Sequence, residues 1–557
     1  MTSPATAASR SRTPAPSRLA GLGHDVDGTP LPDARRRLQP LVTGSDGRWA
    51  WWGPLAVTAV AGVLRFWNLG RPDNVLFDET YYAKDAYSLL LHGYVRESVD
   101  RADARIARGD VDRLFTDSAD FYVHPDVGKW LIAAGEWLFG MDSFGWRAAA
   151  AAAGTLMVLV LARLVRRVTG STLLGCVAGL LLAVDGLHFV MSRLALLDIF
   201  LALFVLCAVA CLVADRDWGR VRLAARGPGG RSGAERIGPV RGLLVRPWRL
   251  AAGVCFGLAC GTKWSAVFFL AAFGLLTWAW DSSARHAIGV RRPVLTSAVV
   301  DAVPAFISLV VVAAAVYLLT WLPWLAHAER FEEALGSDWG AYLETDARGG
   351  AEVAQSLRSL WHFHGEVWGF HTGEGLRDET HPYQSDAAGW LVINRPVGVD
   401  ANVDIPAGRH GCPGPPSGDD CIEQILAIGT PLLWWAGVVA LVVAAGLWVG
   451  ARDWRFGLAL VGVLAGWLPW LLFSDRPIFF FYAVTFVPFT VLAVTLVLGR
   501  VLGPVDAPPR RRRSRAVAAG AFVALVVANF AFLHPVLTDG LLTNEDWLER
   551  IWFTRWI

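Results

Sequence analysis

The stretch that decides the fold is residues 74–87, NVLFDETYYAKDAY, which follow directly on the first long apolar segment of the chain. That segment ends near Leu69, so the adjacent carboxylates of Asp78 and Glu79 lie just past the edge of a predicted membrane span. Acidic residues often open a helix merely because they complement its dipole. At the lip of a multi-helix membrane protein, however, ionisable residues can face a water-filled cavity, where they are usually functional. We therefore expect this pair to belong to a functional site.

The composition is that of a polytopic membrane protein. Of the 557 residues, 54% are hydrophobic and only 18% are charged, against about 25% charged in soluble domains. The net charge of +2 gives no indication of a nucleic-acid partner, because the basic residues lie in loops, where they indicate membrane orientation instead. Residues 1–48 are rich in Ser, Pro, Ala and Arg and contain no apolar run, so we predict a disordered cytoplasmic tail.

The apolar segments predict an all-α polytopic fold, with a transmembrane catalytic domain at residues 49–537. About eleven spans are expected: 51–69, 143–165, 173–190, 194–213, two short helices within 249–280, 298–325, 428–449, 456–473, 478–502 and 516–533. Both flanks of the region 249–280 are basic; if both are cytoplasmic, the region must cross twice or not at all, and we interpret it as two short helices. We expect its two helices to meet at Lys263.

Counting the basic loops places the N-terminus inside. Two long polar loops, 70–142 and 326–425, and the C-terminal segment 538–557 then all fall on the outer face. Residues 82–94 and 129–139 in the first loop are too short to span and are predicted to be interfacial helices. No inverted repeat of the kind that many transporters carry is visible.

Several basic residues could hold a phosphate. Lys129 and His124 lie in YVHPDVGK, residues 122–129, where Pro and Gly predict a turn that aims both side chains back at the membrane. A lysine that merely extends to the interface is an equally simple interpretation. Arg65 and Arg147 lie within predicted spans, where each charge costs roughly 2.5–3.5 kcal/mol on insertion scales.

The turn between the spans 173–190 and 194–213 is flanked by Arg193 and Asp198. Charges at this depth are either functional or form ion pairs that lock helices together. Both interpretations remain open for Arg193 and Asp198, and also for Arg65.

The second long loop combines imidazoles with aromatic rings. It contains WHFHG at 361–365 and HPYQS at 381–385. His-x-His occurs in zinc sites, but no third ligand follows at a diagnostic distance, so we favour sugar or peptide binding and predict no metal site. Cys412 and Cys421 lie in a polar part of the same loop and predict a disulfide, because an outer loop is in an oxidising compartment.

Five motifs occur along the chain, and their order is more specific than any one of them alone. Asp-Glu follows the first span, HPDVGK occupies 124–129, RLALLD occupies 193–198, GTK occupies 261–263, and HPYQS with Trp390 occupies 381–390. Together they resemble the protein O-mannosyltransferases, in particular the actinobacterial branch, over about residues 50–557. HPDVGK departs from the family's His-Pro-Pro-Leu-Gly-Lys at two positions. The second loop is too short for the β-trefoil domain of eukaryotic members.

The resemblance implies a large lipid-donor glycosyltransferase fold of the GT-C type. It implies transfer of mannose from polyprenyl-phosphate mannose to Ser or Thr hydroxyls of exported proteins, at the outer face of a bacterial plasma membrane, by inverting direct displacement. The expected partners are the lipid bilayer, the lipid-linked donor and secreted or membrane protein acceptors, with the export translocon as an optional partner. No cofactor other than the lipid-linked donor is expected, and no nucleic acid.

The same resemblance assigns roles to residues. Asp78 is expected to be the catalytic base and Glu79 to position a substrate. Lys129, Arg65 and Arg147, and more weakly His124 and Arg193, are expected to hold the donor phosphate. The expected substrate contacts are Tyr81, Tyr82, Asp198, Lys263, His381, Tyr383, Ser385 and Trp390.

Three alternatives remain at this point. A related lipid-donor glycosyltransferase could use a glycan or lipid acceptor. A secondary transporter could use Asp78 or Asp198 as its proton site, although the carboxylate pair lies at the membrane lip rather than in mid-bilayer. A non-enzymatic scaffold would leave the ordered motifs unexplained.

Overall fold

The computed structural model describes residues 38, 47–225, 241–290, 292–334, 349–377, 379–413, 420–504 and 508–557. The predicted disordered tail at 1–48 lies almost wholly outside the described residues. Parts of the basic loop 215–248 and of the second long loop also lie outside them.

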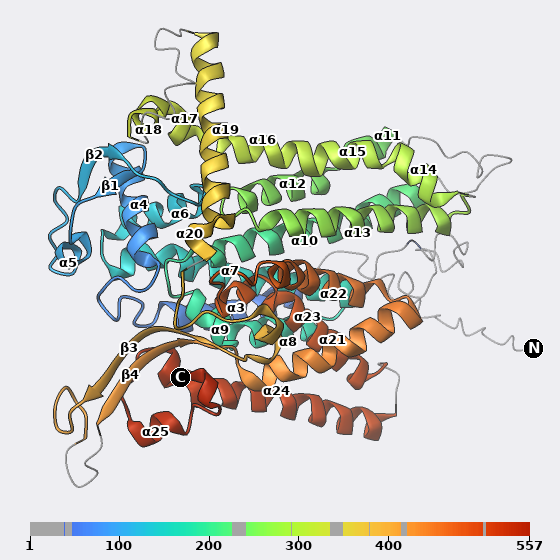
Figure 1. Ribbon diagram of the computed structural model, residues 1–557. Coiled ribbons are helices and arrows are strands. Elements are labelled where there is room, and N and C mark those ends of the chain that lie inside the picture. Colours follow the sequence, from blue (N-terminus) through green and yellow to red (C-terminus); the bar gives the residue numbers. More distant parts are fainter. Residues whose placement is uncertain are drawn as a thin grey trace, which may run out of the picture.

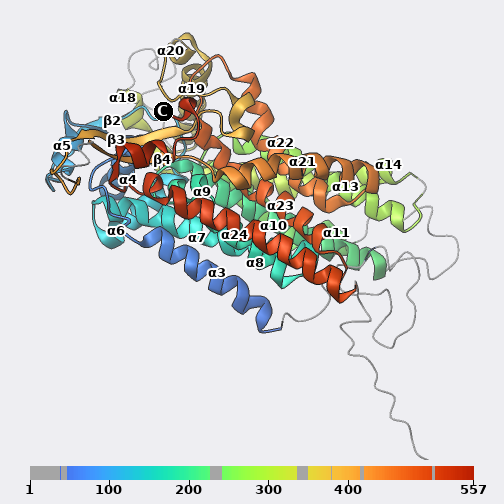
Figure 2. The ribbon, with the colours of Figure 1, turned by 90° about the horizontal axis from the view of Figure 1, so that it is seen from below.

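Apolar helices run side by side in a bundle (Figures 1 and 2). Among the described residues, seven helical segments are long and apolar enough to cross a membrane. They are α7 (Ser143–Thr169), α10 (Leu197–Ala225), α13 (Ala266–Ala287), the run 302–319 made of α15 (Ala302–Phe306), η2 (Ile307–Val311) and α16 (Val312–Leu319), α21 (Pro431–Ala451), α22 (Trp454–Trp467) with η5 (Leu468–Leu472), and α24 (Pro509–Leu537).

The other four predicted spans correspond to shorter or less apolar helices, so the count of eleven stays a prediction. These helices are α3 (Trp49–Phe66), α8 (Thr172–Ala183), α12 (Pro247–Cys260) and α23 (Val487–Leu502). As expected, α12 and α13 meet around Lys263, with residues 261–265 between them. The central helix is α10, which contacts α7, α12 and α13 and is apolar on nearly all sides, as a helix buried within a bundle must be.

The predicted span 173–190 is not one continuous helix, because the structure breaks it at Val184 and Asp185. Helix α8 ends before these two residues, and the short α9 (Gly186–Met191) begins after them. The carboxylate of Asp185 accepts the backbone N–H of His188 at 2.9 Å and the indole N–H of Trp434 at 2.6 Å. A carboxylate that caps the new helix and accepts from α21 stabilises this break.

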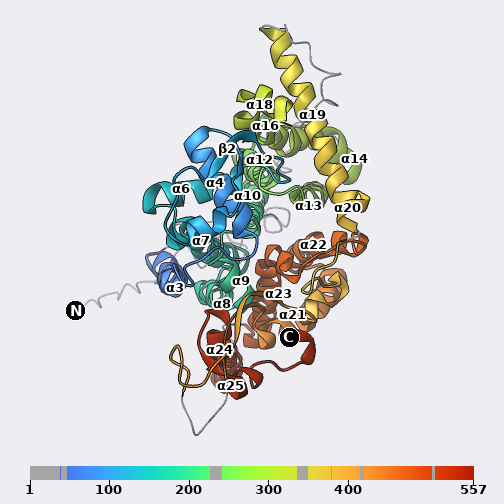
Figure 3. The ribbon, with the colours of Figure 1, turned by 60° about the vertical axis from the view of Figure 1, so that its left-hand side comes forward.

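Both long loops lie at the same end of the bundle (Figure 1). The first contains α4 (Glu79–His92), β1 (Arg96–Ser98), α5 (Ala102–Ile106), β2 (Phe115–Ala119) and α6 (Val127–Phe139). The second contains α17 (Leu322–Ala326), α18 (Ala328–Ala334), α19 (Gly350–Thr372), α20 (Glu374–Arg377), η4 (Ala387–Val392), β3 (Val397–Ile405) and β4 (Cys421–Ala427). Helix α19 stands out beyond the other helices (Figure 3).

Aromatic side chains join the two loops. The ring of Tyr122 in the first loop contacts Phe331 of α18 in the second loop, with centroids 6.0 Å apart, and stacks on Trp321 just before that loop at 5.9 Å. These rings form one buried apolar cluster together with Phe363 of α19. Aromatic pairs of this kind contribute about 0.5–1.5 kcal/mol each beyond their burial, so the two loops form one cap.

The loops contain β-strands, which the all-α prediction does not include. Strands β1 and β2 form an antiparallel pair, and β3, β4 and β5 (Leu542–Thr543) form a small antiparallel sheet beside α25 (Asn544–Leu548) and η7 (Thr554–Trp556). A disulfide joins Cys412 to Cys421 at the base of β4. Its sulfurs are buried with Ile405 and Leu541, so the bridge ties the β3–β4 hairpin to the C-terminal segment.

The opposite end of the bundle carries α11 (Arg241–Leu244) and α14 (Pro293–Val300) (Figures 1 and 2). Basic residues gather there, including the run 510–513 at the start of α24. The excess of arginine predicts that this end faces the cytoplasm.

This orientation can be tested with two exposed valines. Val403 in β3 is 55% exposed, and Val245 beside α11 is 68% exposed at the opposite end. In intact cells, a membrane-impermeant maleimide should label Val403→Cys but should label Val245→Cys only after permeabilisation. The unsubstituted protein gives the background of the five unpaired native cysteines. Labelling of both variants from the same side would rule out the topology.

Candidate active site

The polar segment between α3 and α4 is held by arginine side chains from neighbouring helices. Arg147 of α7 donates to the backbone carbonyls of Leu69, Pro72 and Asn74, at 3.3, 2.8 and 2.8 Å. These carbonyls lie in the irregular segment after α3, where no helix or strand pairs them. The arginine therefore fixes the backbone that leads to Asp78.

Arg193, in the turn before α10, holds the end of α3 in the same way. It donates to the carbonyls of Arg65 and Trp67, at 2.9 and 2.7 Å, and to that of Asn68 at 3.0 Å. Both arginines reach the segment from parts of the chain far away in sequence, so its course depends on the bundle rather than on local propensity.

Glu79 is the first residue of α4 and is fully buried. Its carboxylate accepts five hydrogen bonds. Arg147 donates from Nε and Nη2, at 2.9 and 2.8 Å; the indole of Trp146 donates at 3.2 Å; and the backbone N–H groups of Leu76 and Ala195 donate at 3.0 and 2.9 Å. A carboxylate with both oxygens occupied in this way is a structural anchor, because no oxygen is left for a substrate.

Asp78, one residue earlier, is in the opposite situation. It is half-buried, and its carboxylate makes no hydrogen bond or ion pair within the described part of the chain. The preceding residue, Phe77, has a φ of +49°, which is rare for an aromatic residue. Backbone strain of this kind costs of order 1–3 kcal/mol and tends to occur at functional sites.

The ring of Phe77 is held by aromatic contacts. It makes edge-on contacts with His381, Phe479 and Phe481, each with centroids 5.7 Å apart. These contacts stabilise the strained conformation and connect the second loop to the backbone beside Asp78.

A pocket of about 170 Å³ opens close to Asp78. It lies between the α12–α13 junction, the end of α19 and the segment that joins α22 to α23. The side chains that give it its chemistry are His124, Asp198, Lys263, His371, Arg476 and Tyr482, with Trp264, Trp368 and Trp470 as aromatic walls. A pocket with aromatic walls and a few converging polar groups is the usual form of a ligand site.

Lys263 and Asp198 form an ion pair in this pocket, with Nζ and Oδ2 2.7 Å apart. Their charges also reach Asp78. Burial raises the pKa of Asp78 to about 6, while the ammonium of Lys263 opposes the rise and the carboxylate of Asp198 adds to it. A free carboxylate whose pKa lies near neutrality can act as a general base.

Arg476 supplies the second cation of the pocket. Its Nε is buried and without a hydrogen-bond partner among the described residues, and its Nη1 lies 3.5 Å from Nδ1 of His371. Burial first, and the guanidinium of Arg476 next, lower the pKa of His371 to about 4. Burial also holds the pKa of His124 well below its usual value, so both imidazoles are neutral at pH 7.

The other cations expected at a phosphate are held by protein groups. Lys129 is buried, lies 3.1 Å from the Asp85 carboxylate and sits over the ring of Tyr122, with Nζ 3.6 Å from its centroid. Arg65 is fully buried in α3 and contacts Nδ1 of His188 at 2.8 Å. With Arg147 and Arg193 already described, four of the five expected phosphate ligands are engaged elsewhere, and only His124 lines the pocket.

The expected substrate contacts separate into those that line the pocket, which are Asp198 and Lys263, and those outside its lining. Tyr82 is buried, and its pKa is raised well above the usual value by burial first and by the charges of Asp78 and Asp198 next, whereas Tyr81 is 63% exposed. His381 accepts the backbone N–H of Tyr383 at 3.1 Å.

Ser385 and Trp390 are joined to each other. The indole N–H of Trp390 donates to the Ser385 hydroxyl at 2.8 Å, and Trp390 is almost fully buried. This pair packs the loop rather than lining the pocket.

Arg476, His371 and Tyr482 were not singled out from the sequence. The signal for Arg476 was present, because SDRP at 474–477 interrupts two apolar segments at the end of the bundle where the loops gather. A charged residue at such a break is a candidate functional residue, as an intramembrane charge is. Among the residues that the structure describes, no cluster of His, Cys, Asp or Glu is arranged to hold a metal ion.

Comparison with known proteins places these features in a family. A model described as dolichyl-phosphate-mannose-protein mannosyltransferase matches residues 55–222, and one for the C-terminal four-TMM region of protein-O-mannosyltransferase matches 356–556. A polyprenol-phosphate-mannose–protein mannosyltransferase of Mycolicibacterium smegmatis is 37% identical over 98% of this chain and 98% of its own length. The chain belongs to the protein O-mannosyltransferase family. The expected resemblance to the actinobacterial branch is confirmed.

A second relative in this family, from Mycobacterium tuberculosis, is 38% identical over 90% of both chains. A solved protein O-mannosyltransferase complex of S. cerevisiae, bound to the sugar donor, superposes with a TM-score of 0.66 at 13% identity, over 92% of this chain and 93% of that one. This likeness confirms the predicted GT-C fold.

The buried anchor of this mannosyltransferase can be distinguished from the free carboxylate beside it. Glu79→Gln leaves the guanidinium of Arg147 buried without its counter-charge, which should cost about 3–5 kcal/mol of stability. The midpoint of thermal unfolding in detergent should fall accordingly.

Asp78→Asn is the matched control, because it makes the same change in charge one residue away on a carboxylate that has no bonded partner. Its unfolding midpoint should remain close to that of the parent. Equal losses in the two variants would contradict the division between Glu79 as anchor and Asp78 as free group.

Proposed function

We propose that this protein transfers mannose from a polyprenyl-phosphate-linked donor to Ser or Thr hydroxyls of proteins. The names of its relatives supply the donor and the class of acceptor. The single structural observation that carries the proposal is the free carboxylate of Asp78, which lies beside a pocket containing Lys263 and Arg476.

In the proposed reaction, the hydroxyl oxygen of the acceptor attacks the anomeric carbon of mannose. Its proton passes to Asp78 as the bond between that carbon and the phosphate oxygen breaks. Polyprenyl phosphate leaves with the bonding electron pair. A single base on one side of the sugar is what an inverting direct displacement requires, and the residual negative charge falls on the phosphate.

The proposed phosphate ligands are Arg476 and Lys263. Arg476 lines the pocket with a buried Nε that has no partner among the described residues, and a guanidinium suits a phosphate because it donates in a planar fork. Lys263 is paired with Asp198, so its charge is partly offset. Arg65, Lys129, Arg147 and Arg193 contact protein groups and do not line the pocket, which argues for this set over the one expected from sequence.

The proposed location is the outer face of a bacterial plasma membrane. The pocket is lined from the end of α19 and the α12–α13 junction, on the side where the long loops gather. Helices α11 and α14, in arginine-rich parts of the chain, lie at the other end of the bundle (Figure 1). This arrangement supports an extracytoplasmic site. A contact with the export translocon remains an expectation for an enzyme that modifies proteins in transit.

The activity is tested with the purified protein, radiolabelled polyprenyl-phosphate mannose and a Ser/Thr-rich peptide. Label should pass to the peptide, and Asp78→Asn should reduce turnover by about 10²–10⁴-fold, because loss of a general base typically costs that much. Parallel reactions with a glycan and with a lipid acceptor test the rival glycosyltransferase. Transfer to either of these but not to the peptide would overturn the proposal.

The pH profile tests the same base independently. Because the pKa of Asp78 is raised to about 6, the carboxylate is protonated and inactive below that pH and available above it. The value of kcat/KM should therefore fall about tenfold per pH unit below pH 6. The residual activity of Asp78→Asn should lack this limb; if the limb persists, another group is the base.

The phosphate assignment predicts a defect in donor use for Arg476→Gln. Loss of one charge-assisted contact, at about 1.5–3 kcal/mol, should lower kcat/KM for the donor about 10–100-fold and leave the KM for the peptide nearly unchanged. Arg377→Gln is the matched control, because Arg377 is exposed, pairs with Asp475 beside Arg476 and does not line the pocket. A similar donor defect in both variants would contradict the assignment.

A further inference from the structure

Helix α19 carries an exposed apolar stripe, formed by Leu357, Trp361 and Trp368. All three side chains are exposed, and that of Trp361 is 81% exposed. A different side of the helix, which contains Phe363, is already buried in the aromatic cluster of the cap. The stripe is therefore additional to the packing surface of α19, and apolar surface of this kind marks an interaction site.

Helix α19 crosses the outer ends of the membrane helices instead of running parallel to them (Figure 1). It extends beyond them to one side (Figure 3). Its 23 residues cover about 34 Å, yet it is not among the seven described segments that are long and apolar enough to span. A helix that crosses the axis of the bundle at its outer end lies along the membrane surface.

His364 shows which side of α19 faces the membrane helices. Its Nε2 lies 2.6 Å from the hydroxyl of Tyr317, near the end of α16. Its ring stacks on Trp264, just before α13, with centroids 5.5 Å apart. At 100° per residue, all three residues of the stripe lie within about 60° of His364 around the helix. The stripe therefore faces the side on which the membrane helices lie.

The opposite side of α19 is polar. Arg358, His362 and Glu366 lie about 120–160° around the helix from His364. Nε2 of His362 and a carboxylate oxygen of Glu366 are 3.6 Å apart. An apolar stripe toward the membrane and polar side chains away from it are typical of an amphipathic helix that lies in the interface.

The stripe continues the apolar outer surface of the bundle. Leu318 and Leu319 at the end of α16 are exposed, and so is Val267 at the start of α13. Both helices belong to segments that can cross a membrane, so we expect the hydrocarbon of the bilayer to reach these side chains. Because α19 meets α13 and α16 at this level, its stripe borders the same lipid-facing surface.

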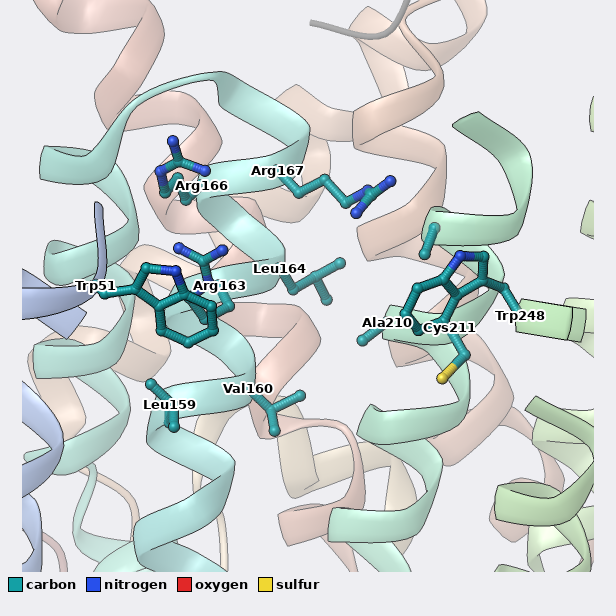
Figure 4. A pocket seen from close by; sticks show the side chains of 11 residues that line it. Trp51, Leu159, Val160, Arg163, Leu164, Arg166, Arg167, Ala210, Cys211 and Trp248 are labelled. Carbon is teal, nitrogen blue, oxygen red and sulfur yellow. The ribbon is translucent and has the colours of Figure 1, made fainter. Parts of the chain in front are cut away.

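Tryptophan side chains mark both levels at which the bundle meets water. At the end opposite the long loops, the exposed Trp51 and Trp248 lie on opposite sides of a pocket (Figure 4). Helix α13 begins beside α19 and runs toward that end, and its 22 residues rise by about 33 Å, close to the thickness of a hydrocarbon core. Tryptophan is enriched at both interfaces of a membrane, so Trp361 and Trp368 lie at the level expected for the outer one.

We propose that α19 lies in the outer leaflet of the membrane, with Leu357, Trp361 and Trp368 between the lipid headgroups and the acyl chains. Trp368 also lines the active-site pocket, so the stripe places the edge of that pocket at the lipid surface. For a lipid-linked donor, a step that rests on the proposed function, the phosphate then reaches the pocket while the polyprenyl chain stays in the leaflet.

Nitroxide labels test this position in the full-length protein reconstituted into phospholipid nanodiscs. Leu357→Cys and Trp361→Cys place labels on the stripe, and Arg358→Cys and His362→Cys, one residue further along, are the matched controls on the polar side. Molecular oxygen, which concentrates in hydrocarbon, should relax the stripe labels more than the control labels, and a water-soluble nickel chelate should do the reverse. The stripe labels should lie about 5–10 Å into the boundary between headgroups and acyl chains. The unsubstituted protein gives the background of the five unpaired native cysteines.

Two results would overturn the proposal. Equal access of the nickel chelate to all four labels would place the stripe in water. Protection of the Leu357→Cys and Trp361→Cys labels from both reagents would show that protein covers the stripe. The labels report the position of α19 whether or not mannose is transferred, so this test and the activity test can fail independently.

Discussion

The buried carboxylate of Glu79 is the constraint on which the active-site end of this protein depends. Removing a charge from water costs several kcal/mol, and the cost is offset only when hydrogen bonds and a counter-charge meet it from all sides. Here the donors come from α7, from the turn before α10 and from the chain just before α4. Satisfying this one group therefore fixes three segments relative to one another.

Arg147 extends the same constraint along the chain. Its five N–H groups are divided between Glu79 and three backbone carbonyls of the segment that follows α3. The position of Asp78 is set by this framework and by the packing of Phe77, so Asp78 needs no bond of its own. A base must keep a lone pair free for the incoming proton, whereas an anchor must not, and the two neighbouring carboxylates divide these roles.

The sequence was sufficient for features that depend on local pattern. Seven of the predicted apolar spans, the junction at Lys263, the disulfide between Cys412 and Cys421, and the place of Asp78 and Glu79 at one end of the bundle all follow from composition and order. Periodicity and basic-loop counting report which segments enter the membrane. They carry no information about which distant atoms a charged side chain meets.

The phosphate site is a part of the structure that the sequence pattern could not predict. Arg147 and Arg193 are indistinguishable from phosphate ligands in the sequence, because the carbonyls that they hold lie more than 70 residues away and carry no side-chain signature. Arg476 is marked in the sequence only by the break that SDRP makes between two apolar segments, and only the fold brings it to His371, 105 residues earlier. The break between α8 and α9 was missed for the same reason, since it depends on Asp185 reaching Trp434 of α21.

Arginine performs two different tasks in this protein, and the number of acceptors around each guanidinium distinguishes them. Where the protein itself supplies carboxylate and carbonyl oxygens for every N–H, as for Arg147, the cation organises the backbone and a ligand could bind only by displacing those acceptors. Arg476 is in the other situation, because its buried Nε has no hydrogen-bond partner among the described residues and its side chain lines the active-site pocket. A guanidinium that keeps a donor unoccupied at a pocket can accept a phosphate without breaking an existing contact, so Arg476 suits a ligand and Arg147 suits the framework.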